Sequence, residues 1–289
     1  MLNAAVAKYL RTLLILGRTS NLPTVWSNCI AGWYLGAGED WTRLLVLCVG
    51  ATCLYLGGMF LNDAFDADFD RQHRSERPIP TGAISVGGVW LWGLGWLAAG
   101  ALILMQFGRV TAILTLLLLI CILIYDAVHK AMAFAPVLMA VCRFLLYLVA
   151  SSVSEQGVGG LAIWGGFALA AYIIGLSFIA RRESTRGAVS GWPAILLLAP
   201  IGLAMLVNTG SYLTTALQLS VLLGLWILWC LSHTLWRPNR NVGRTVAGLL
   251  AGIVLVDLVA ITGAPLWLGM LLLVLFASTL VFQRFIPAT

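Results

Sequence analysis

The sequence predicts an all-α membrane protein, a polytopic bundle of transmembrane helices, and three observations support this fold class. The chain of 289 residues is 61% hydrophobic and only 10% charged, with a mean hydropathy of +0.98. Its apolar residues form runs long enough to cross the hydrocarbon core of a bilayer. The basic residues cluster in the short segments between these runs, as they do in helical membrane proteins. One soluble domain could not bury this much apolar surface.

Hydropathy divides the chain into ten predicted spans that form a single membrane domain over residues 1–289. Residues 1–19 carry Lys8, Arg11 and Arg18 around a short apolar run, without a small-residue cleavage site. We therefore expect an amphipathic segment that lies on the membrane surface. The predicted spans are residues 20–37, 43–61, 84–106, 110–125, 134–153, 161–180, 191–208, 212–235, 245–262 and 265–283.

The distribution of basic residues predicts the orientation of the chain. If the amino terminus is cytoplasmic, all 17 lysine and arginine residues except Arg43, Arg109 and Arg143 fall on that same side. This asymmetry favours an even number of crossings with both termini inside. We expect a multi-pass protein of the bacterial inner (plasma) membrane, whose basic charge serves orientation and binds no nucleic acid.

An acidic cluster directly after the second apolar run is the strongest chemical signal in the sequence. On a helix, Asn62, Asp63, Asp66 and Asp70 fall within about 100° of arc, whereas Asp68 points to the other side. Carboxylates this close repel one another and stay ionised only if a cation neutralises them. Oxygen ligands of this kind suit a hard divalent ion such as Mg²⁺. The orientation above predicts that this aspartate-rich loop is cytoplasmic.

Other polar residues receive simpler interpretations. Arg143 and Asp257 fall inside predicted spans, and we expect both to face the interior of the bundle because charge in hydrocarbon is costly. Asp126, at the end of another span, is expected at the surface, and His73 is expected to be a solvated loop residue. A faint internal repeat aligns residues 55–66 with residues 172–183, which would set a second polar loop, residues 181–190, opposite the aspartates.

The acidic cluster and its flanks resemble the first aspartate-rich motif of the UbiA superfamily of intramembrane prenyltransferases. Tyr125 and Lys130 also resemble the tyrosine and lysine pattern at the cytoplasmic end of the family's fourth helix. Within the superfamily, residues 178–187 look most like the EboC-type branch. The motif residues are Asn62, Asp63, Asp66 and Asp70, followed by Arg71, Arg74, Arg77-Pro78 and Gly82-Ala83-Ile84-Ser85.

This resemblance implies a bundle of nine transmembrane helices around a central cavity that opens sideways to lipid, so the expected count is nine to ten. It implies Mg²⁺-dependent transfer of an isoprenyl group from a prenyl diphosphate to a small, aromatic or otherwise electron-rich acceptor that the sequence does not identify. The implied metal ligands are Asn62, Asp63, Asp66 and Asp70. The implied catalytic residues are Asp63, Asp66, Lys130 and Glu183. The implied diphosphate-binding residues are Arg71, Arg74, Arg77, Lys130, Arg181 and Arg182.

The second polar loop departs from the family pattern, in which it carries two or more aspartates. Here the tract has the single acid Glu183 among Arg181, Arg182 and Arg186. We expect one well-defined Mg²⁺, with arginines neutralising part of the diphosphate charge. An alternative is a divergent, non-catalytic member that binds or transports a lipid-linked or secondary-metabolite precursor. A CDP-alcohol phosphotransferase would need an Asp-Gly-x-x-Ala-Arg motif, which is absent from the sequence.

Overall fold

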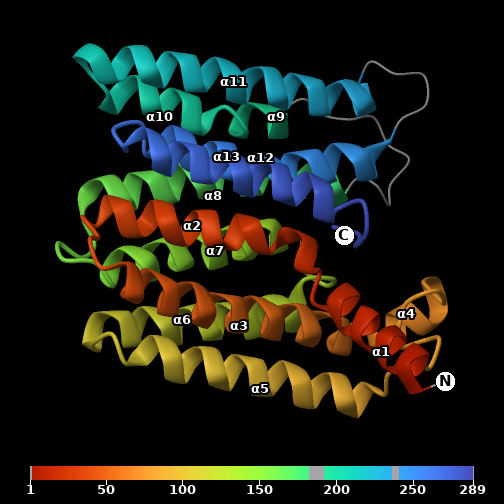
Figure 1. Cartoon of the computed structure of the whole chain (residues 1–289). Helices are drawn as coiled ribbons and strands as arrows, with labels where there is room; N and C mark the ends of the chain where they lie inside the picture. The colour runs from red at the N-terminus through yellow and green to blue at the C-terminus, as the bar shows by residue number, and fades with distance from the viewer. Residues whose placement is uncertain (1, 182–191, 236–240, 289) are drawn as a thin grey trace.

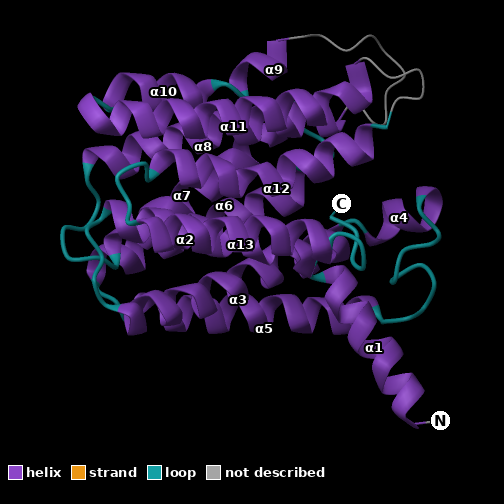
Figure 2. Ribbon diagram, turned by 45° about the horizontal axis from the view of Figure 1, so that its top comes forward, coloured by secondary structure: helices purple, strands orange, loops and turns teal. Residues whose placement is uncertain are grey.

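The computed structural model describes residues 2–181, 192–235 and 241–288, and the regular elements within these ranges are helices (Figures 1 and 2). This confirms the all-α class. The first half contains α1 (Leu2–Leu16), a 3₁₀ turn (Thr19–Asn21), α2 (Leu22–Leu35), α3 (Trp41–Phe65), α4 (Ala67–His73), α5 (Val86–Met105), α6 (Arg109–Val128) and α7 (Ala135–Ser152). The second half contains α8 (Gly160–Arg181), α9 (Trp192–Leu196), α10 (Ala199–Val207), α11 (Gly210–Leu235), α12 (Val242–Ala260) and α13 (Leu266–Phe282).

Within the described ranges, 7 helices are long and apolar enough to cross a membrane by length and composition. The apolar segments Trp192–Val207 and Leu266–Phe282 are shorter, and the expected count of nine to ten spans is therefore not confirmed. The helices long enough to cross are α3, α5, α6, α7, α8, α11 and α12.

The long helices lie side by side along one direction, and the short α1 and α4 project at the end of the bundle where both termini lie (Figure 1). Small residues permit close contact between α3 and α5. A Cβ added at Gly57 would lie 2.9 Å from the carbonyl oxygen of Gly93, and one added at Gly93 would lie 3.3 Å from the backbone nitrogen of Leu61. Glycine at such positions lets two membrane helices approach closely. The end of α3, which carries the aspartates, is thereby held firmly against α5.

The seventh predicted span is broken into α9 and α10. Pro200 stands in the first turn of α10. Proline has no N–H to donate to the carbonyl four residues earlier, and its ring clashes with that carbonyl, so an uninterrupted helix is disfavoured here. The run is apolar as predicted, but the pattern of apolar residues alone does not reveal this interruption.

The prediction that Arg143 and Asp257 face the bundle interior is confirmed. The Nη1 of Arg143 on α7 donates to Asn28 Oδ1 at 2.7 Å, and Asn28 Nδ2 donates to Asp257 Oδ2 at 2.7 Å. Ser27 Oγ donates to the same carboxylate oxygen at 2.6 Å. Asn28 thus connects the two charged groups and ties α2, α7 and α12 together below the aspartate cluster.

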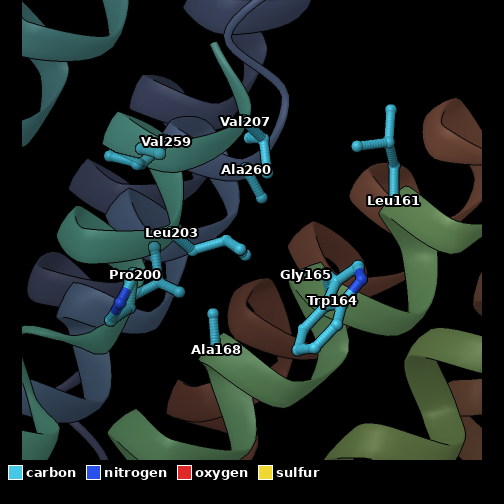
Figure 3. A pocket seen from close by; sticks show the side chains of 11 residues that line it. Leu161, Trp164, Gly165, Ala168, Pro200, Leu203, Val207, Val259 and Ala260 are labelled. Carbon is cyan, nitrogen blue, oxygen red and sulfur yellow. The ribbon is translucent and has the colours of Figure 1, made fainter.

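A separate apolar pocket lies between α8, α10 and α12, at the opposite end of α8 from Arg181 (Figure 3). Trp164 and Gly165 line it from α8, Leu203 from α10 and Val259 from α12. Its lining carries no titratable side chain. The pocket therefore offers no charged or acid–base group, and the chemically active side chains lie at the other end of the bundle.

Candidate functional site

The aspartates share one buried face because helical geometry continues across the junction of α3 and α4. Asp66, between the two helices, has φ −81° and ψ −5°, and its N–H donates to the Asn62 carbonyl at 3.0 Å. The N–H of Asp70 in turn donates to the Asp66 carbonyl at 2.9 Å. Asn62, Asp63, Asp66 and Asp70 are 5%, 6%, 6% and 2% exposed, whereas the side chain of Asp68 is 90% exposed. The predicted common face is thus confirmed.

Two arginines from different segments neutralise Asp63 and Asp70. Arg77 Nη1 lies 3.2 Å from Asp63 Oδ1 and 2.9 Å from Asp70 Oδ2. Arg18 Nη2 approaches Asp63 Oδ1 at 3.3 Å and donates to Asn62 Oδ1 at 3.2 Å. Burial by itself lowers the pKa of Arg18, but the charge of Asp63, together with Tyr55, Tyr125 and Asp66, outweighs this and holds that pKa above its ordinary value. Arg18 therefore stays charged inside the cluster.

The chain brings these arginines to the aspartates by two turns. Arg18 has the left-handed backbone conformation, with φ 41°, at the bend between α1 and the 3₁₀ turn. Arg77 lies in the segment after α4, where Gly82 has φ 73° and Ser85 caps α5 by accepting from the N–H of Gly88. Glycine adopts such a positive φ without strain from a side chain. The turn that precedes Arg77, in which its N–H donates to the Arg74 carbonyl at 3.1 Å, leaves the Arg77 side chain in contact with Asp70.

The end of α6 supplies the partners of Asp66. Lys130 Nζ lies 2.8 Å from Asp66 Oδ1, and His129 Nε2 lies 3.3 Å from the same oxygen. Lys130 Nζ also sits 3.7 Å from the centroid of the Phe69 ring. Burial raises the pKa of Asp66, but the hydrogen bonds from His129 and Lys130 outweigh it and hold the pKa below its ordinary value. Asp66 is therefore ionised at neutral pH.

The expected surface position of Asp126 is wrong. Asp126 is only 2% exposed, and its Oδ1 accepts from Asn62 Nδ2 at 3.2 Å. Its Oδ2 is buried without a hydrogen-bond partner among the residues that the structure describes. The correction has a simple cause, because the last turn of α6 packs toward α3 and directs this carboxylate to the aspartate face.

Several expected diphosphate-binding residues lie outside this cluster. Arg71 pairs with Asp68 at 2.6 Å on the outward face, and Arg74 is exposed. Arg181 donates to the carbonyl oxygens of Ala133 at 2.6 Å and His129 at 3.4 Å, beside the loop that follows α6. Arg182 and Glu183 fall outside the described residues, as does most of the loop expected opposite the aspartates.

Sequence reasoning missed three residues of the cluster, which are Arg18, His129 and Asp126. Arg18 was counted among the orienting charges, although its position just before an apolar span was a usable signal. His129 adjoins Lys130, and Asp126 precedes Lys130 by four residues. Asp126 lies in the last turn of α6 and Lys130 just beyond its end, and this closeness in the chain could have marked Asp126 as part of the same site.

The donor chemistry of the cluster fits Mg²⁺. Asn62, Asp63, Asp66 and Asp70 offer hard oxygen ligands, and Asp70 Oδ1 is buried without a hydrogen-bond partner among described residues. Among all the residues that the structure describes, no three acidic, histidine or cysteine side chains lie close enough together to hold a metal ion by themselves. Mg²⁺ usually binds through one or two carboxylates together with water and substrate phosphate oxygens. The residues therefore suit an ion that arrives with a phosphorylated ligand.

Comparisons with known proteins find relatives in sequence. Two curated relatives are both named digeranylgeranylglyceryl phosphate synthase. The one from Ignicoccus hospitalis is 33% identical over 102 residues, which is 35% of this chain and 33% of the relative. The one from Methanothrix thermoacetophila is 32% identical over 126 residues, which is 43% of this chain and 47% of the relative. The matches thus span about a third to a half of these relatives.

Solved structures share the fold. A UbiA homolog from Archaeoglobus fulgidus bound to GPP and Mg²⁺ has a TM-score of 0.63 and 16% identity, over 96% of this chain and 99% of that chain. The apo structure of a UbiA homolog from Aeropyrum pernix K1 has a TM-score of 0.65 and 16% identity, over 81% and 94%. The family model for the UbiA prenyltransferase family matches residues 20–247, well over half of the sequence. The chain therefore belongs to the UbiA prenyltransferase family.

Proposed function

We propose that this protein is an intramembrane, Mg²⁺-dependent prenyltransferase that moves an isoprenyl group from a prenyl diphosphate to a nucleophilic acceptor. The observation that carries the proposal is the pairing of buried acids with partly buried cations at one end of the bundle. Asp63 and Asp70 contact Arg77, and Asp66 contacts Lys130. A metal ion and a diphosphate carry opposite charges. Such a cluster can bind both if its carboxylates leave their cationic partners to hold the metal ion and the cations then contact the diphosphate.

This exchange assigns roles to the residues. The carboxylates of Asp63, Asp66 and Asp70, with the amide oxygen of Asn62, would hold Mg²⁺, which neutralises charge on the departing diphosphate. The cations Arg18, Arg77 and Lys130, released from these carboxylates, would then contact phosphate oxygens, for which guanidinium groups have matching geometry. Arg181 would reach the same ligand from the side of the loop after α6, and Arg182 and Glu183 are proposed to complete the site. Arg71 and Arg74 are proposed as outer phosphate contacts only.

The reaction follows from this charge arrangement. The allylic carbon to oxygen bond breaks, its electron pair leaves with the diphosphate, and the acceptor forms the new bond and loses a proton. Fixed positive charge at the place where negative charge develops lowers the barrier most. Asp66, held ionised by Lys130 and His129, keeps this positive charge in position until the ligand binds.

The donor and acceptor are proposed by class. The Archaeoglobus fulgidus homologs were solved with GPP or DMAPP and Mg²⁺, which supports a short prenyl diphosphate as the first donor to assay. We propose a small aromatic or otherwise electron-rich acceptor. The name of the curated relatives adds the hydroxyl of a prenylated glyceryl phosphate as a second acceptor to test. An integral multi-pass location with the aspartates facing the cytoplasm completes the proposal.

The test is calorimetric binding of geranyl diphosphate by the detergent-purified protein, with and without Mg²⁺. Binding should require Mg²⁺ and should be lost in Asp66→Ala, while Asp68→Asn, on the outward face, should bind as the unmodified protein does. Undiminished binding by Asp66→Ala would contradict the proposal. Incubation with an acceptor should then release inorganic diphosphate. Tight binding without any release for either acceptor class would instead identify a non-catalytic carrier.

A further inference from the structure

Asp126 differs from the other buried acids of the cluster in having no cationic partner. Asp63, Asp66 and Asp70 each lie within 3.3 Å of an arginine, lysine or histidine nitrogen. Asp126 forms no ion pair with any residue that the structure describes, and the one hydrogen bond of its carboxylate comes from the neutral amide of Asn62. A buried carboxylate oxygen without a partner is costly, so this atom is a site where a ligand would be stabilised.

The hydrogen bond to Asn62 connects Asp126 directly to the proposed cation site. Asn62 Nδ2 donates to Asp126, and Asn62 Oδ1 accepts from Arg18 Nη2 at 3.2 Å. If the Asn62 side chain were flipped, its amide oxygen would face the Asp126 carboxylate and its N–H groups would face the Arg18 guanidinium. Both contacts would be unfavourable. Asp126 therefore keeps the amide oxygen of Asn62 on the side of Arg18 and Asp63.

The position of Asp126 along the chain strengthens this connection. It lies in the last turn of α6, four residues before Lys130, which follows the end of this helix and whose Nζ contacts Asp66 at 2.8 Å. It is also close enough to interact electrostatically with His129, Arg18 and Asp66. The carboxylates thus approach the site from two directions, three from the junction of α3 and α4 and one from α6.

We propose that Asp126 is the fourth carboxylate of the cation site, in which its Oδ1 holds Asn62 and its open Oδ2 binds the divalent ion that accompanies the diphosphate. This inference rests on the proposed function, since it requires a divalent ion at this end of the bundle. It adds a ligand from α6 to a set that the sequence motif confines to α3 and α4. The ion would consequently hold α3 and α6 together when the donor is bound.

The experiment measures Mn²⁺ affinity by the loss of the free-ion electron paramagnetic resonance signal, in the presence of a non-hydrolysable geranyl thiodiphosphate. Asp126→Asn keeps the size and shape of the side chain but removes its negative charge. It should weaken Mn²⁺ binding about 10- to 100-fold, the range found when groups that support a metal site are removed. Asp68→Asn is the matched control, because Asp68 lies outside the site, and its Mn²⁺ affinity should stay within about twofold of that of the unmodified protein.

A second variant covers the case in which Asp126→Asn does not fold. Asp126→Cys replaces an oxygen ligand by sulfur, so it should favour Cd²⁺ over Mg²⁺ relative to the unmodified protein. Mn²⁺ affinity unchanged in Asp126→Asn, or a Cd²⁺ preference unchanged in Asp126→Cys, would overturn the inference while leaving the proposed function intact. Absence of Mn²⁺ binding by the unmodified protein with the same donor would overturn the proposed function and the inference together.

Discussion

Replacement of Arg77 by methionine should damage both the stability of the protein and its binding of the donor. Arg77 is the only cation within ion-pair distance of Asp70 among described residues, and the Asp70 side chain is 3% exposed. Removing one partner of a buried ion pair costs roughly 3–5 kcal/mol, because the other charge is left uncompensated. Since the Arg77 side chain is 18% exposed, we expect the lower end, about 3 kcal/mol. Asp63 retains Arg18 and contributes little to this loss.

The assay is thermal unfolding of the ligand-free protein in detergent, followed by calorimetric binding of geranyl diphosphate with Mg²⁺. At roughly 2–4 °C per kcal/mol, Arg77→Met should lower Tm by roughly 6–12 °C. Loss of a charged hydrogen bond worth about 1.5–3 kcal/mol should weaken donor binding roughly 10- to 150-fold. Arg74→Met, an exposed change in the same segment, is the control for the loss of Tm only. Equal Tm values for the two variants would refute the reasoning.

A second substitution separates the two effects of Arg77→Met. Asp70→Asn in the Arg77→Met background removes the uncompensated charge, so it should recover part of the lost Tm. It should not restore donor binding, because a carboxylate has then been lost together with the cation. Recovery of both properties would show that Arg77 serves folding alone and does not contact the diphosphate.

Three further predictions follow from other contacts. The pKa of Asp66 is lower in the folded protein than its value of about 3.9 in the unfolded chain. The stability that Asp66 contributes is therefore present above a pH of about 3.9 and is lost as the pH falls through the folded pKa. Tm measured against pH should drop in acid for the unmodified protein and less for Asp66→Asn, and parallel curves would contradict this. Arg143→Met removes the charged donor that binds Asn28, which in turn donates to Asp257, and should lower stability by roughly 1.5–3 kcal/mol as measured by Tm, whereas the double change with Asp257→Asn should cost less than the sum of the two single changes. With the aspartate end cytoplasmic, Ser75→Cys should react with an impermeant maleimide only in inside-out vesicles and Gln156→Cys only in right-side-out vesicles; the reverse pattern would invert the predicted orientation.

The sequence alone determined the class of the fold and the face that carries the aspartates. Long apolar runs require helices in a membrane, because backbone groups in hydrocarbon must be satisfied within the segment. The spacing of Asn62, Asp63, Asp66 and Asp70 follows the helical period, so their common face was predictable even though a junction interrupts the helix. Lys130 was predictable only through the family pattern.

Only the tertiary structure decided which charges meet these aspartates. Arg18 and Asp63 are 45 residues apart, and Asn62 and Asp126 are 64 residues apart, so no local period relates them. Arg77 and Arg71 have the same charge and similar positions in the chain, yet one folds back onto Asp70 and the other pairs with Asp68 on the outward face. Helical periodicity fixes direction within one segment, whereas the packing of α1, α3 and α6 fixes which segments share a site.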